Sequence, residues 1–92
     1  MNLGEVIKKC RKLRGLTQSQ VSVLANMSES YLSLLEKNKR EPSLTALESI
    51  ADALKIPVSI LVFLGSEQNN ISELTEQQIE SLTSSIYRMI ES

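Results

Sequence analysis

The sequence contains no histidine, no tryptophan and a single cysteine among its 92 residues. These absences exclude a structural zinc cluster of Cys and His, a Cys–His nucleophile pair and a Ser–His–Asp triad. The lone Cys10 has no partner for an internal disulfide, which is typical of a reducing cytoplasm. We therefore expect a cytoplasmic protein that is not an enzyme and that has no cofactor and no metal.

Aromatic residues and long apolar runs are also scarce. Only Tyr31, Phe63 and Tyr87 carry large rings, so we expect a core that is mainly aliphatic. The longest apolar run, residues 60–64, is far shorter than the roughly 20 residues that span a bilayer. The first residues lack the basic and apolar stretches of a signal peptide. We expect no membrane association, and a length that suits one small domain with one added helix.

The charge of the chain is nearly balanced but unevenly distributed. Residues 1–65 hold nine Lys and Arg against six Asp and Glu, whereas residues 66–92 hold one against five. The basic residues form two groups: Lys8, Lys9, Arg11, Lys12 and Arg14, and then Lys37, Lys39 and Arg40. A basic half with an acidic tail indicates a surface for a polyanion. Solvated helix faces have the same composition, so charge leaves both interpretations open.

Apolar residues recur at spacings of three and four along most of the chain, and no segment alternates with period two. This spacing predicts short helices over residues 3–14, 17–26, 28–38, 43–56 and 57–64, and a longer amphipathic helix near the end. In the first helix the apolar stripe that includes Cys10 faces inward, so the basic residues are expected on the exposed face. We divide the chain into a domain over residues 1–65, a polar linker over 66–73 and a C-terminal helix over 74–92.

Polar residues and glycine mark the ends of these helices. Three residues tolerate the left-handed backbone that ends a helix: Gly15, Asn26 and Asn38. Four residues are placed as N-caps: Thr17, Ser28, Ser43 and Thr75, of which Thr17 and Thr75 open capping boxes. The helices over 17–26 and 28–38 are therefore short and joined by a tight turn. Two such helices flanked by basic residues have the form of a DNA-binding helix-turn-helix.

Two runs resemble a known family: Leu-Thr-Gln-Ser-Gln-Val-Ser over 16–22 and Ser-Glu-Ser-Tyr-Leu-Ser-Leu-Leu-Glu-Lys-Asn-Lys-Arg-Glu-Pro-Ser-Leu over 28–44. Both are similar to the phage-repressor (Cro/cI, Xre-type) helix-turn-helix family, and the resemblance covers roughly residues 3–64. It implies an all-α, five-helix lambda-repressor-like domain with the helix-turn-helix at its second and third helices, here followed by an amphipathic C-terminal helix. It also implies a transcriptional regulator that binds double-stranded DNA.

The resemblance implies a set of DNA-binding residues: Thr17, Gln18, Ser28, Glu29, Ser30, Tyr31, Ser33, Leu34, Lys37, Asn38, Lys39 and Arg40. Gln18 would bind a phosphate, and Ser28 would cap the recognition helix. Glu29 and Leu34 stand where the family often has Arg or Gln. A carboxylate accepts a hydrogen bond from cytosine N4 but is repelled by phosphates, so we expect a cytosine preference or modest affinity. Leu34 would pack on a thymine methyl group.

One recognition helix reads only a few base pairs, so we expect a homodimer on an inverted-repeat operator. The expected interface joins the apolar fifth helix to the last helix through six residues: Phe63, Leu64, Ile79, Leu82, Ile86 and Met89. Folding of the last helix onto its own domain is the alternative arrangement. Three functions stay open: a repressor, an antitoxin-like autorepressor whose C-terminal helix binds a small protein partner, and a controller of a restriction–modification operon.

Overall fold

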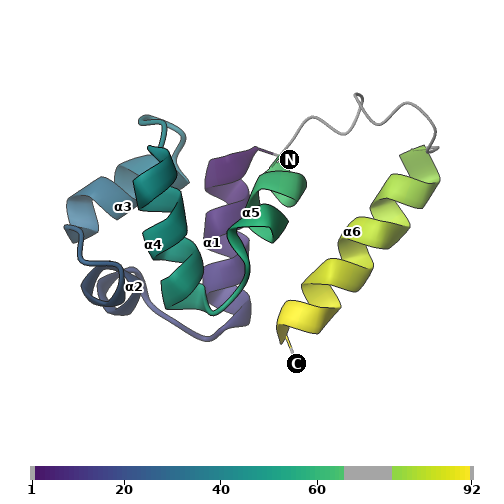
Figure 1. Cartoon of the computed structure of the whole chain (residues 1–92), viewed down its shortest axis with the longest axis horizontal. Coiled ribbons are helices and arrows are strands. Elements are labelled where there is room, and N and C mark those ends of the chain that lie inside the picture. Colours follow the sequence, from purple (N-terminus) through teal and green to yellow (C-terminus); the bar gives the residue numbers. More distant parts are fainter. Residues whose placement is uncertain (1, 66–75, 92) are drawn as a thin grey trace.

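The computed structural model describes residues 2–65 and 76–91, except for the side chains of residues 76–79, 82 and 83. These residues form six helices and no strand: α1 (Leu3–Leu13), α2 (Gln18–Leu24), α3 (Glu29–Glu36), α4 (Leu44–Leu54), α5 (Val58–Gly65) and α6 (Glu76–Glu91) (Figure 1). The predicted all-α fold is confirmed. Each helix expected from the sequence is present.

Side-chain caps begin α2, α3 and α4 where the sequence predicts them. Thr17 Oγ1 accepts from the backbone N–H of Gln20 at 3.1 Å, and Gln20 Oε1 accepts from Thr17 N–H at 2.8 Å, so the capping box is closed. The hydroxyls of Ser28 and Ser43 each accept from the amide three residues further on. These bonds satisfy N–H groups that have no partner inside the helix. The capping box expected at Thr75 lies outside the described residues.

Left-handed residues end the helices and turn the chain. Gly15, Asn26 and Asn38 have φ values of 71°, 55° and 59°, as expected from their residue types. Lys55, the C-cap of α4, also has a positive φ of 58°, and the sequence does not predict it. The guanidinium of Arg14 donates to the carbonyl oxygens of Leu54 and Lys55, at 2.9 and 3.2 Å. Hydrogen bonds from a residue 40 positions earlier in the chain therefore stabilise the end of α4.

The core is centred on α1, which contacts α3, α4, α5 and α6. Val6, Ile7 and Cys10 of α1 are fully buried, and aliphatic residues of the other helices surround them. Burial raises the pKa of the Cys10 thiol to about 11. The thiol is therefore neutral at physiological pH and behaves as a small apolar side chain, as expected.

The C-terminal helix α6 packs against α1 of the same chain. Tyr87 and Ile90 are 6% and 4% exposed and belong to the core. The ammonium of Lys9 lies 4.2 Å from the centre of the Tyr87 ring, a cation–π contact between α1 and α6. Of the two arrangements left open by the sequence, the structure shows this helix folded onto its own domain. Its role in dimerisation stays a prediction.

Candidate nucleic-acid interface

Helices α2 and α3 pack on each other at the end of the molecule away from α6 (Figure 1). Ser22 of α2 is buried, and its small side chain lets the two helices approach. Its hydroxyl donates to the Ser19 carbonyl oxygen at 2.8 Å, so the buried polar group has a partner. Val21 and Leu32 are fully buried on the inner side. The left-handed Asn26 turns the chain between the two helices. This arrangement is that of a helix-turn-helix.

The outer side of α3 is open to solvent. Four residues of α3 line a shallow hollow together with Gln18 of α2: Glu29, Ser30, Ser33 and Leu34. Glu29, Ser30 and Leu34 are exposed, and Ser33 is half-buried. The structure thus brings Gln18 and four of the predicted base-reading residues onto one surface, which we call the recognition face.

A buried ion pair connects α1 to the end of α3. Arg11 Nε donates to Glu36 Oε2 at 2.8 Å, and Arg11 Nη2 donates to Glu36 Oε1 at 3.0 Å. Arg11 and Glu36 are 8% and 5% exposed. Arg11 Nη1 also donates to the carbonyl oxygen of Leu16, just before α2. A bidentate pair of this kind fixes both side chains in orientation as well as in distance.

The same carboxylate holds the predicted phosphate-binding residue. Gln18 Nε2 donates to Glu36 Oε1 at 3.0 Å. The Gln18 amide is therefore oriented from within the protein at the edge of the recognition face. The sequence does not predict this network, because helical spacing places Arg11 with the other basic residues of its helix and no pattern singles out Glu36. No local pattern joins residues 25 positions apart.

The rest of the first basic group divides between two environments. The expectation that all five residues are exposed is wrong for Arg11, which is buried, and for Arg14, which is half-buried and bonded to the end of α4. Lys8, Lys9 and Lys12 are exposed. Only these three lysines of α1 present their charge to solvent.

Asn38 has a structural part in the fold. Its Oδ1 accepts from the Gly4 backbone N–H at 3.1 Å, and its Nδ2 donates to Asn2 Oδ1 at 2.7 Å. Its side chain therefore joins the turn after α3 to the start of α1. A Cβ at Gly4 would collide with the Leu35 carbonyl oxygen and with the Asn38 side chain. The close approach of α1 and α3 thus requires glycine at this position.

The loop after α3 carries the second basic group. Lys37, Lys39 and Arg40 are all exposed. The Arg40 guanidinium lies 5.6 Å from the centre of the half-buried Tyr31 ring, which restrains the loop against α3. Thr17 and Ser28, also predicted to contact DNA, use their hydroxyls as N-caps.

The residues predicted for a dimer interface differ in exposure. Leu64 is fully buried in the core of its own chain, so it offers no surface to a partner here. Phe63 and Ile86 are half-buried, and Met89 is 73% exposed. The side chains of Ile79 and Leu82 lie outside the described residues.

Two further properties concern the described part of the chain alone. It contains no group of three or more His, Cys, Asp or Glu side chains placed to hold a metal ion. None of its helices combines the length and the apolar character needed to cross a membrane.

The paired short helices, the tight turn and the open recognition face define a DNA-binding helix-turn-helix domain. A helix-turn-helix family model matches residues 7–61, and the chain belongs to this family. The resemblance to phage repressors is thereby confirmed. The family and its repressors point to a DNA-binding regulator and not to an enzyme.

Curated relatives extend the likeness beyond the family model. The chain is 38% identical to the immunity repressor protein of Bacillus phage phi105, over 99% of this chain and 66% of that protein. It is 35% identical to the transcriptional regulator ClgR of Mycobacterium tuberculosis, over 72% of this chain and 59% of the regulator. It is 34% identical to the transcriptional regulator SinR of Bacillus subtilis, over 65% of this chain and 55% of that regulator. The matches thus span 55% to 66% of these relatives' own lengths.

Proposed function

We propose that this protein is a sequence-specific transcriptional repressor that binds an inverted-repeat operator as a homodimer and blocks a promoter by occupying it. The observation that carries the proposal is the recognition face, where exposed side chains of α3 stand beside a Gln18 amide held by Glu36. The likeness to a phage immunity repressor over nearly the whole chain supports repression. A cytoplasmic location follows from this function as part of the proposal.

The recognition face has a definite chemistry for reading bases. Ser30 and Ser33 hydroxyls donate to or accept from either type of base edge. The Glu29 carboxylate accepts from the cytosine amino group, and the Leu34 side chain packs on a thymine methyl group. The exposed Lys37, Lys39 and Arg40 then contact phosphates, which position the domain without reading sequence.

Dimerisation would place two copies of α3 about 34 Å apart, in successive major grooves on one side of the duplex. The outer surfaces of α5 and α6 are the proposed contact. Val62 and Met89 are 49% and 73% exposed there, and Phe63 and Ile86 are half-buried. Packing of α6 on α1 leaves Val62 and Met89 exposed on this surface, where a second copy could cover them.

Selection of duplexes from a random-sequence DNA pool, at roughly physiological salt, tests the operator. We expect an enriched inverted repeat with half-site centres about 10 base pairs apart. Ser33→Glu places a carboxylate on the recognition face and should abolish enrichment. Ser84→Glu makes the same change at an exposed position of α6, away from the recognition face, and should preserve enrichment. A folded protein that enriches no sequence would contradict the proposal and favour the antitoxin-like, partner-dependent alternative.

The mass of the full chain in solution tests the dimer. We expect a dimer at micromolar concentration, and Met89→Glu should shift it towards monomer because a charge enters an apolar contact. Ser84→Glu adds the same charge to an exposed position of the same helix and should leave the dimer intact. A wild-type chain that stays monomeric on operator DNA would contradict this part of the proposal.

A further inference from the structure

We propose that Lys8 and Lys12 of α1 bind the DNA phosphate backbone beside Gln18, so that the DNA-contact surface extends from the helix-turn-helix onto the first helix. This inference rests on the proposed DNA-binding function and adds a second group of phosphate contacts to it.

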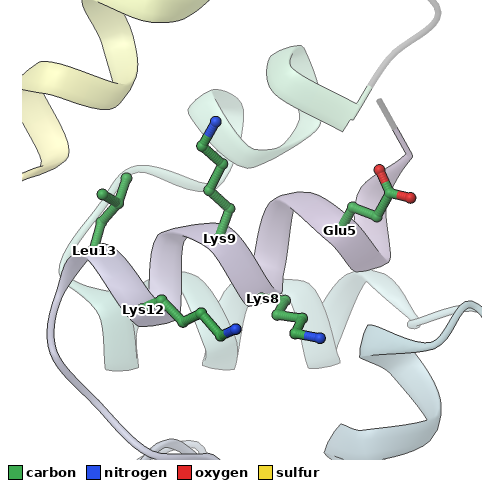
Figure 2. Close-up of a pocket in the computed structure, with 5 residues that line it drawn as sticks. All are labelled: Glu5, Lys8, Lys9, Lys12 and Leu13. Carbon is green, nitrogen blue, oxygen red and sulfur yellow. The ribbon is translucent and has the colours of Figure 1, made fainter.

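The side chains of Lys8 and Lys12 share one direction. Figure 2 shows Lys8 and Lys12 pointing to the side of α1 on which α3 lies. Glu5 and Lys9 line the same hollow as these two lysines, but in Figure 2 they point towards α5, and Lys9 reaches the Tyr87 ring of α6. Lys8 and Lys12 are four residues apart and therefore lie one above the other, about 6 Å apart along the helix axis. They form a short basic stripe on one side of the helix.

The buried ion pair places this stripe next to the recognition face. Arg11 lies one residue before Lys12 and three after Lys8, and its guanidinium bonds to the Glu36 carboxylate that also holds Gln18. This turn of α1 is thus fixed to both α2 and α3. A phosphate that reaches the Gln18 amide comes close to the part of α1 that carries Lys8 and Lys12.

The charge of the two lysines is not neutralised within the described part of the chain. Both are exposed, and neither forms an ion pair with a described residue. By contrast, Arg11 is paired with Glu36, Arg14 bonds to backbone carbonyls, and Lys9 lies over the Tyr87 ring. Exposed lysines that face a duplex release condensed counterions when they approach its phosphates, which favours binding in a salt-dependent way.

The test is the salt dependence of binding by the full chain. We would measure the affinity of wild-type protein and of the double variant Lys8→Ala/Lys12→Ala for the selected operator, between 50 and 300 mM salt. Each phosphate contact contributes about 0.9 to the slope of log affinity against log salt, so the slope should fall by about two for each bound protomer. The ranking of operator variants should not change, because phosphate contacts carry no sequence information.

Lys9→Ala is the matched control, since it removes one charge from the same helix on the side that faces α6. It should leave the slope unchanged. The pair Lys8→Gln/Lys12→Gln should behave like the alanine pair, and circular dichroism melting verifies that each variant is folded.

The possible outcomes separate this inference from the proposed function. Specific binding with an unchanged slope in the double variants, or an equal loss in Lys9→Ala, would overturn the inference and leave the regulator standing. Wild-type protein that binds no DNA at any salt would overturn both. A slope lowered only by changes at Lys8 and Lys12 would support the extended contact.

Discussion

Arg11 and Glu36 form a bidentate ion pair, 25 residues apart in the chain, whose carboxylate also holds the amide of Gln18. Both charged side chains are almost entirely withdrawn from water. One pair of residues therefore connects the packing of three helices with the orientation of a side chain on the recognition face.

Removal of one member should leave the other charge buried without a partner. We expect Glu36→Gln to lower the free energy of unfolding by about 3 kcal/mol or more. The double variant Arg11→Met/Glu36→Leu should recover much of this loss, because it leaves no uncompensated charge. Urea unfolding at neutral pH measures both effects, with the exposed Glu41→Gln as control. A loss below 1 kcal/mol in Glu36→Gln would contradict the structural role.

Glu29 should determine a base preference. Glu29→Ala removes the acceptor for the cytosine amino group, so discrimination at the matching position should fall by about 1 kcal/mol, roughly five-fold. Overall affinity should rise, because a carboxylate next to phosphates is also removed. Competition between operator variants measures the preference. An unchanged profile would exclude Glu29 from the readout.

Gly4 should not tolerate a side chain. Its Cβ would meet the Leu35 carbonyl oxygen, a backbone atom, so Gly4→Ala should separate α1 from α3 and destabilise the fold by about 3 kcal/mol. Lys12→Ala also introduces alanine into α1, but at an exposed position, so it should change the free energy of unfolding by no more than about 0.5 kcal/mol. Thermal melting compares the two variants. Equal melting temperatures would mean that the helices have room to adjust.

Tyr87 should hold α6 on α1. Tyr87→Ala removes a buried ring and its contact with the Lys9 ammonium, at a cost of about 3 kcal/mol. We expect the amides of residues 80–91 to exchange hydrogen faster, while those of α1 to α4 stay protected. Ser84→Ala, at an exposed position of the same helix outside the proposed dimer contact, serves as the control. Unchanged exchange in Tyr87→Ala would show that other contacts suffice.

Alkaline pH should weaken the fold. Burial raises the pKa of Cys10 to about 11 and, together with the nearby Cys10 and Glu5 charges, that of Tyr87 to about 12. The ordinary values of 9.0 and 10.0 apply in the unfolded chain, which therefore binds fewer protons than the folded chain between pH 9 and pH 12. The free energy of unfolding should fall as pH rises through this window. Urea unfolding at pH 8, 10 and 11 measures this decrease. In Tyr87→Phe the free energy of unfolding should depend less on pH in the upper part of the window. Equal slopes for the two proteins would contradict the role of Tyr87.

Much of the recognition face is predictable because its determinants are local. Ser28 caps α3 through the amide three residues on, and the alternation of buried Leu32 and Leu35 with exposed Glu29 and Leu34 follows from helical spacing. The surroundings of Gln18 are not predictable in this way. Its partner Glu36 lies 18 residues away, at the end of another helix.

Caps, left-handed turns and periodicity act within about four residues, so the amino-acid sequence alone predicts where most of the helices begin and end and which stripe of each faces inward. The burial of particular charges, the left-handed end of α4 at Lys55 and the packing of α6 depend on contacts between distant residues, which exist only in the folded chain. Arg11, Arg14 and Lys9 look alike in a basic helix. The carboxylate of Glu36, the carbonyl oxygen of Leu54 and the ring of Tyr87, brought near by folding, give each a different role.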